Sequence, residues 1–163
     1  MGDEEWFVQH GSDMEDCQVR NILCIWDDES EIKARTSISD FYDQYKNCSK
    51  EEILAVKKER QKAFLNRFAV ALKPLGFKKK GARWTKVLDI GKALTFDAQK
   101  SSFSDQYYLN VTVHDASNIY AMYSYERVVM YGKDIYNWQL MTDEQIDNLI
   151  QVSLKNYIEP KMN

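Results

Sequence analysis

Two stretches of the chain place apolar side chains at steps of three and four residues, the spacing of one face of a helix. The first stretch follows a capping box at residues 49–52, Ser-Lys-Glu-Glu, in which serine and glutamate pair with free backbone N–H groups. We expect Pro74 and Gly76 to end this helix. The second stretch follows a similar box at residues 142–145, and we expect Pro160 to close it. The pattern predicts a long central helix and a C-terminal helix.

Between these helices, apolar and polar side chains alternate, and turn residues separate the stretches, as is typical of strands. Residues 107–114 show the pattern most clearly, because Tyr, Leu, Val and Val alternate with Tyr, Asn, Thr and His. Short turns between successive strands favour an antiparallel meander. The fold class predicted is therefore α+β, an antiparallel meander sheet of about five strands packed by the two helices. The predicted strands are 77–80, 83–90, 93–100, 107–114, 119–125 and 127–131.

The N-terminal part of the chain has a different character. Residues 1–16 are rich in Asp, Glu and Gly and lack an apolar period, so we expect a flexible acidic leader. A short apolar run at 19–26 predicts a strand, and residues 39–45 predict a short helix. The length of 163 residues suits one domain. We expect a single α+β domain over 17–163, with an acidic strand–helix extension at 17–49 and a core at 50–160.

Charge is distributed unevenly along the chain. Residues 1–52 carry 14 acidic and 5 basic side chains, a net charge of −9, whereas residues 53–163 carry 11 acidic and 17 basic ones, a net charge of +6. This division predicts that the acidic segment either lies on a basic face of the body or forms a surface for a charged partner.

The sequence lacks the markers of a membrane or secreted protein. No stretch approaches the ~18 uninterrupted apolar residues of a membrane span, and the first residues lack the order of a secretory signal. Cys17, Cys24 and Cys48 have none of the short CxxC spacings of a zinc site, and their odd number fits a reducing compartment. We therefore expect a cytoplasmic protein without a membrane partner.

Few side chains suggest enzymatic chemistry. His10 and His114 are the two histidines, and a histidine beside an aspartate at a strand end is more often structural than catalytic. No GxxxxGK[ST], GxGxxG or GxSxG motif occurs, and the acidic residues 27–31 lack the glycine and spacing of a calcium loop. We expect no catalytic residue, metal or cofactor; an unrecognised enzyme would depend on His114.

Positive charge and aromatic side chains alternate at the first predicted hairpin. Phosphate contacts and base stacking by such residues hold single-stranded nucleic acid. The opposing interpretation is that a lysine run is a solvated sheet edge and that the tryptophan belongs to the core. The candidate nucleic-acid-binding residues are Lys78, Lys79, Lys80, Arg83, Trp84 and Lys86.

Tyrosines are concentrated between residues 107 and 136. Exposed tyrosines favour protein interfaces, because each offers a large contact area and a hydroxyl group at a modest cost in entropy. The same residues also fit cross-strand pairs on the outer face of a sheet. The sequence leaves both interpretations open.

Three segments carry a family resemblance. Residues 68–84, FAVALKPLGFKKKGARW, look like an opening signature, and residues 97–104 followed by 107–111 resemble a Q-K-S block before an aromatic strand. Residues 138–160 resemble a closing helix. Together they resemble, over about 50–160, the bacterial domain-of-unknown-function family numbered 4304.

The resemblance implies no established activity, so no catalytic residue follows from it. It implies a context, because similar small bacterial α+β proteins are regarded as immunity proteins against toxins delivered between neighbouring cells. The leading hypothesis is a non-enzymatic protein-binding module that neutralises a cognate toxin, such as a basic nuclease attracted by acidic side chains. The alternative is a nucleic-acid-binding protein that uses the basic hairpin. The candidate partner-binding residues are Asp27, Asp28, Glu29, Glu31, Asp40 and Asp43.

Overall fold

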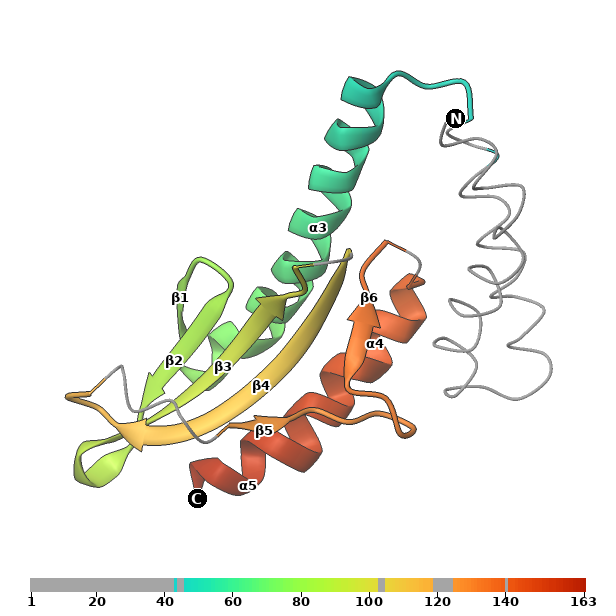
Figure 1. Cartoon of the computed structure of the whole chain (residues 1–163). Coiled ribbons are helices and arrows are strands. Elements are labelled where there is room, and N and C mark those ends of the chain that lie inside the picture. Colours follow the sequence, from blue (N-terminus) through green and yellow to red (C-terminus); the bar gives the residue numbers. More distant parts are fainter. Residues whose placement is uncertain (1–42, 44–45, 103–104, 119–124, 140) are drawn as a thin grey trace.

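The computed structural model describes residues 43, 46–102, 105–118, 125–139 and 141–163, except the side chain of Ile90. The strand predicted at 19–26, nearly all of the helix predicted at 39–45 and most of the strand predicted at 119–125 lie outside these residues. Figure 1 shows a curved sheet with two long helical segments against it.

The central helix α3 (Lys50–Leu72) begins and ends where the sequence predicts. The Ser49 hydroxyl accepts a hydrogen bond from the Glu52 amide at 3.2 Å, and the Glu52 carboxylate accepts one from the Ser49 amide at 2.7 Å. A 3-10 turn η1 (Lys73–Leu75) follows, and Gly76 then adopts a left-handed conformation with φ of 86°. A side chain at this position would strain the backbone, so glycine ends the helix here.

The sheet is antiparallel with the strand order β1-β2-β3-β4-β5, and β6 pairs with the first residues of β4. This confirms the α+β fold and the meander. The strands are β1 (Lys78–Lys80), β2 (Arg83–Val87), β3 (Lys92–Lys100), β4 (Gln106–Asp115), β5 (Glu126–Arg127) and β6 (Ile135–Asn137). The 3-10 turn η2 (Asp89–Gly91) connects β2 to β3.

The strand predicted at 127–131 is wrong in its extent, because β5 ends at Arg127. The chain reverses just afterwards, where Tyr131 and Gly132 have φ of 52° and 77°. A single bridge joins Met130 to Lys133 across this turn. Two consecutive residues with positive φ form a tight hairpin turn, and a strand cannot continue through it.

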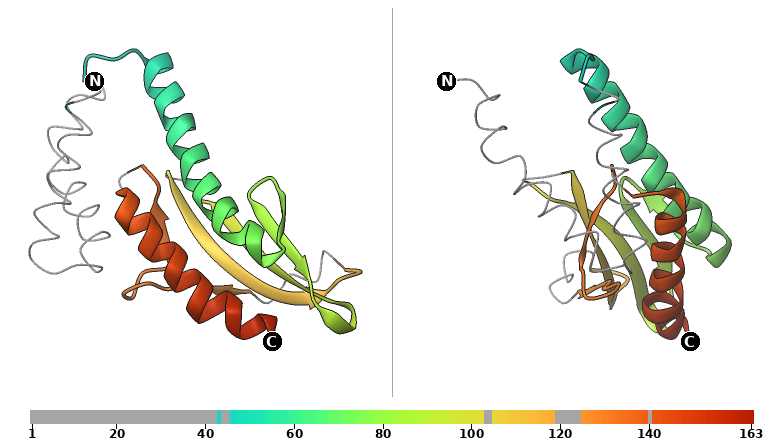
Figure 2. Two further views of the ribbon diagram at one scale, coloured as in Figure 1. Left: turned by 180° about the vertical axis from the view of Figure 1, so that it is seen from behind. Right: turned by 90° about the vertical axis from the view of Figure 1, so that its right-hand side faces the viewer.

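One face of the sheet is covered by helices, as both views in Figure 2 show, and the core lies between this face and the helices. From α3, Phe64, Phe68 and Leu72 are buried against this face. The Phe68 and Phe96 rings lie 5.2 Å apart between centroids, and Trp84 and Phe96 lie 5.6 Å apart. Ile146, Leu149, Ile150 and Ile158 from the C-terminal segment complete the core.

The C-terminal helical segment begins at its predicted capping box but does not end at Pro160. α4 (Asp143–Val152) continues into a π-helical turn, η3 (Ser153–Ile158), and then into α5 (Glu159–Met162). Pro160 lies in the first turn of α5, where a missing N–H costs no hydrogen bond. The expectation that Pro160 closes the helix is therefore wrong. None of the helices among the described residues is long and apolar enough to cross a membrane.

Candidate functional site

The opposite face of the sheet, which we call the open face, carries a cavity of about 550 Å³ over β1, β2, β3 and the end of β4. None of the helices in the described ranges lies on this face (Figure 2). Cross-strand partners point their side chains to the same side of a sheet, so the strand register determines which residues line the cavity.

Three cross-strand rows form the floor of the cavity. Successive rows are two residues apart along β2, which corresponds to about 7 Å. The charged row contains Lys80, Arg83 and Asp97, the hydroxyl row contains Lys78, Thr85 and Thr95, and the apolar row contains Val87, Ala93 and His114. Ala116 adds to the apolar end. The cavity therefore changes from cationic to apolar along its length.

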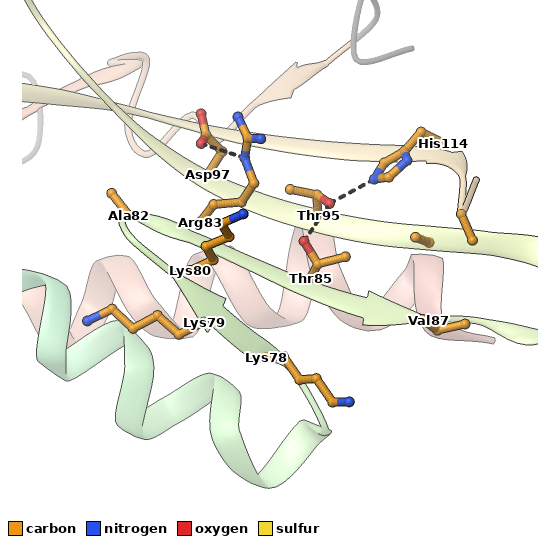
Figure 3. A pocket seen from close by; sticks show the side chains of 12 residues that line it. Lys78, Lys79, Lys80, Ala82, Arg83, Thr85, Val87, Thr95, Asp97 and His114 are labelled. Atoms are coloured by element: carbon orange, nitrogen blue, oxygen red, sulfur yellow. Dashed lines mark hydrogen bonds and ion pairs between the residues drawn. The ribbon is translucent and has the colours of Figure 1, made fainter. Parts of the chain in front are cut away.

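The charged end is positive in sum. Arg83 Nε donates a hydrogen bond to Asp97 Oδ1 at 3.2 Å, as Figure 3 shows. Asp97 is the single acidic side chain among the described residues that line the cavity, while Lys78 and Lys80 are exposed beside it. An anionic group of a ligand would therefore bind at this end.

A chain of hydrogen bonds crosses the middle of the cavity. The hydroxyl oxygens of Thr85 and Thr95 lie 3.0 Å apart, and that of Thr95 lies 2.8 Å from Nε2 of His114 (Figure 3). His114 Nδ1 donates to the backbone carbonyl of Asp115 at 2.9 Å. Thr95 and His114 are 1% and 7% exposed, whereas Thr85 is half-buried and borders the cavity.

The structure divides the candidate nucleic-acid-binding residues between the two faces. Lys78, Lys80 and Arg83 lie together on the open face. Trp84 is 1% exposed and packs in the core, so it offers no surface for base stacking, and we remove it from the candidates. The core interpretation of Trp84 is the one the structure supports.

Lys79 and Lys86 point away from the open face. The Lys79 ammonium lies 5.7 Å from the centre of the Trp84 ring, although the residue still borders the cavity. Lys86 Nζ lies 3.9 Å from the sulfur of Met162. Alternation along β1 and β2 causes this division, since neighbouring residues of a strand point to opposite faces.

Thr85 and Thr95 were not among the residues predicted from the sequence, and His114 was considered as a structural or a catalytic histidine, not as part of a binding cavity. The available signal was the two-residue turn at Gly81 and Ala82, which pairs Lys80 with Arg83 and so places Thr85 opposite Lys78. The pairing of Thr95 and His114 depends on longer connections that carry no comparable signal.

Most of the acidic candidate residues, Asp27, Asp28, Glu29, Glu31 and Asp40, lie outside the described residues. Asp43 is described; its side chain is 71% exposed, and its Oδ1 lies 3.8 Å from Lys46 Nζ. Within the described part of the chain, no three His, Cys, Asp or Glu side chains are grouped to hold a metal ion.

Comparison with protein-family models gives one finding, and comparisons with curated proteins and with solved structures give no match. Residues 68–135 match the family described as Domain of unknown function (DUF4304). The match extends from the C-terminal part of α3 to the start of β6, so it includes every strand that lines the cavity. It confirms the resemblance drawn from the sequence. Over residues 68–135, the chain is similar to the DUF4304 family.

Proposed function

We propose that this domain is a non-enzymatic binding module that holds one nucleotide of a single-stranded nucleic acid in the open-face cavity. The observation that carries the proposal is the order of the three rows, from cations through hydroxyl groups to an apolar wall. A nucleotide has the same order of parts, a phosphate, a sugar with hydroxyl groups and a base.

The dimensions of the cavity support this assignment. Its volume of about 550 Å³ falls within the range of small-molecule sites. Lys78, Lys80 and Arg83 would contact the phosphate, while Val87 and Ala93 would contact the base.

The same geometry favours a single strand over a duplex. A base can reach the apolar row only when it is unstacked, as in single-stranded loops and ends. Because Trp84 is buried, the base would meet aliphatic side chains instead of an aromatic ring. Phosphate contacts would then supply most of the affinity, and binding would weaken strongly with salt.

The experiment measures fluorescence anisotropy of a labelled single-stranded oligonucleotide at about 50 mM and about 200 mM salt. The test variant is Lys78→Glu with Lys80→Glu on the open face. The matched control is Lys58→Glu with Lys62→Glu, which makes the same change in net charge at exposed positions of α3. We expect affinity to fall at least about tenfold in the test variant and by less than about twofold in the control. No binding by the wild-type protein, or equal losses in both variants, would refute the proposal.

As a second candidate function, we propose an immunity-type protein that binds a cognate toxin in the cytoplasm. The charge of −9 on residues 1–52 supports this proposal, because an acidic segment would attract a basic partner such as a nuclease. Its test is a pull-down from the source organism with the purified protein at low and moderate salt. Recovery of one basic polypeptide, lost when Asp27, Asp28 and Glu29 become lysine, would support the proposal, and recovery that is insensitive to these changes would reject it.

A further inference from the structure

The hydrogen atoms of the chain that joins Thr85, Thr95 and His114 are fixed in direction. The carbonyl oxygen of Asp115 can only accept, so the nitrogen 2.9 Å away, His114 Nδ1, carries a hydrogen atom. In the neutral imidazole, Nε2 is then an acceptor. The Thr95 hydroxyl, 2.8 Å from Nε2, must donate to it.

This assignment determines what Thr85 presents to the cavity. A threonine hydroxyl has one hydrogen atom, and that of Thr95 is already directed at His114. The contact of 3.0 Å between the two hydroxyl oxygens must therefore be a bond that Thr85 donates. Thr85 keeps only its lone pairs for a ligand, so it acts as an acceptor beside the cationic end of the cavity.

We propose that Thr85 makes the cavity prefer RNA to DNA by accepting a hydrogen bond from the ribose 2′-hydroxyl; this inference rests on the nucleic-acid function proposed above. Phosphate oxygens are acceptors and cannot pair with Thr85, whereas a 2′-hydroxyl can donate. A deoxyribose in the same place would exclude water from the Thr85 lone pairs without offering them a donor, and a site built for a hydroxyl rejects ligands that lack it.

Thr95 and His114 are positioning residues in this scheme. They are buried in the floor of the cavity, where they hold the Thr85 hydrogen away from the ligand. Lys78, the cross-strand neighbour of Thr85, brings the phosphate to the adjacent position.

The experiment compares oligouridylate of about ten nucleotides with the oligodeoxyuridylate of equal length, which differs only at the 2′ position. A third probe, 2′-fluoro oligouridylate, keeps the ribose-like sugar conformation but cannot donate a hydrogen bond. We expect the full-length protein to bind the RNA about fivefold to tenfold more tightly than either other probe.

Variants at the hydroxyl row assign the preference to Thr85. Thr85→Val should bind all three probes with the affinity that the wild type has for the deoxy probe, and Thr85→Ser should retain the preference. Thr112→Val is the matched control, because Thr112 extends the same row but does not border the cavity. We expect it to retain the preference as well.

The outcomes separate this inference from the proposed function. Equal binding of RNA and DNA that still requires Lys78 and Lys80 would overturn the role of Thr85 and leave the nucleic-acid function standing. Tight binding of the 2′-fluoro probe would also overturn it, because sugar conformation would then explain the preference. Failure of all probes to bind would overturn both.

Discussion

Thr95 and Thr112 are cross-strand partners that are similarly buried, but within the described part of the chain only the Thr95 hydroxyl is hydrogen-bonded. They are 1% and 3% exposed, and they face each other on β3 and β4. The Thr95 hydroxyl contacts both Thr85 and His114, whereas the Thr112 hydroxyl has no hydrogen-bond partner among the described residues. Replacing each with valine removes a hydroxyl group from nearly the same environment.

The two substitutions should change the free energy of unfolding in opposite directions. An unpaired hydroxyl that is buried costs about 1 to 3 kcal/mol, so Thr112→Val should stabilise the fold by about 1 kcal/mol. Thr95→Val leaves Nε2 of His114 without a donor and should destabilise the fold by about 1 to 3 kcal/mol. The variants should thus differ by at least about 2 kcal/mol.

Thermal unfolding followed by circular dichroism measures this difference. For a chain of this size, 1 kcal/mol corresponds to a shift in Tm of about 2 to 4 °C. We expect Thr112→Val to melt above the wild type and Thr95→Val below it. Equal destabilisation by both substitutions would show that the two hydroxyl groups are equally well paired, and the fixed direction of the Thr85 hydroxyl would then lose its basis.

Three further predictions concern other parts of the fold. Tyr131→Asn should stabilise the protein by about 1 kcal/mol in urea unfolding, since asparagine tolerates the left-handed backbone at φ of 52° better than tyrosine; a lower urea midpoint would contradict this. Burial raises the pKa of Tyr136. The stability that its neutral phenol contributes to the fold is therefore fully present below a pH of about 10, the pKa of tyrosine in the unfolded chain, and is lost as pH rises above that value. Tyr136→Phe should therefore show a shallower loss of stability above pH 10, and an unchanged slope would contradict this. Phe68→Ala should cost about 3 to 5 kcal/mol, because its ring packs on Phe96 and Trp84, and a cost below about 1 kcal/mol in calorimetry would contradict that packing.

The sequence was most informative where a local rule decides the structure. Both capping boxes and the left-handed Gly76 depend on residues within one helical turn, so their positions could be predicted from composition and spacing alone. It was also predictable that the Lys78 and Lys79 side chains point to opposite faces of the sheet, because successive side chains alternate between the faces in any strand. Trp84, between two polar residues of β2, indicated by the same rule which face the core would occupy.

The arrangement of the cavity depends on contacts between residues that are far apart in the sequence, and no local rule predicts these contacts. Thr85 meets Thr95, and Thr95 meets His114, across 10 and 19 residues of sequence, through connections whose length does not determine a register. Pro160 was misjudged for a similar reason. A proline is tolerated in the first turn of a helix, and Pro160 lies in the first turn of α5, directly after the π-helical turn.

The π-helical turn at Ser153–Ile158 also bears on how the length of this chain can vary. The Glu159 amide bonds to the carbonyl of Leu154, five residues back, so the turn contains one residue more than an α-helical turn. Deleting an exposed residue there, such as Lys155 or Asn156, would restore regular α-helix and leave Ile158 against the core. A deletion within α4 would instead rotate every later side chain by about 100°, turning the apolar stripe away from the sheet. The C-terminal segment can therefore lose a residue at this turn and at few other places.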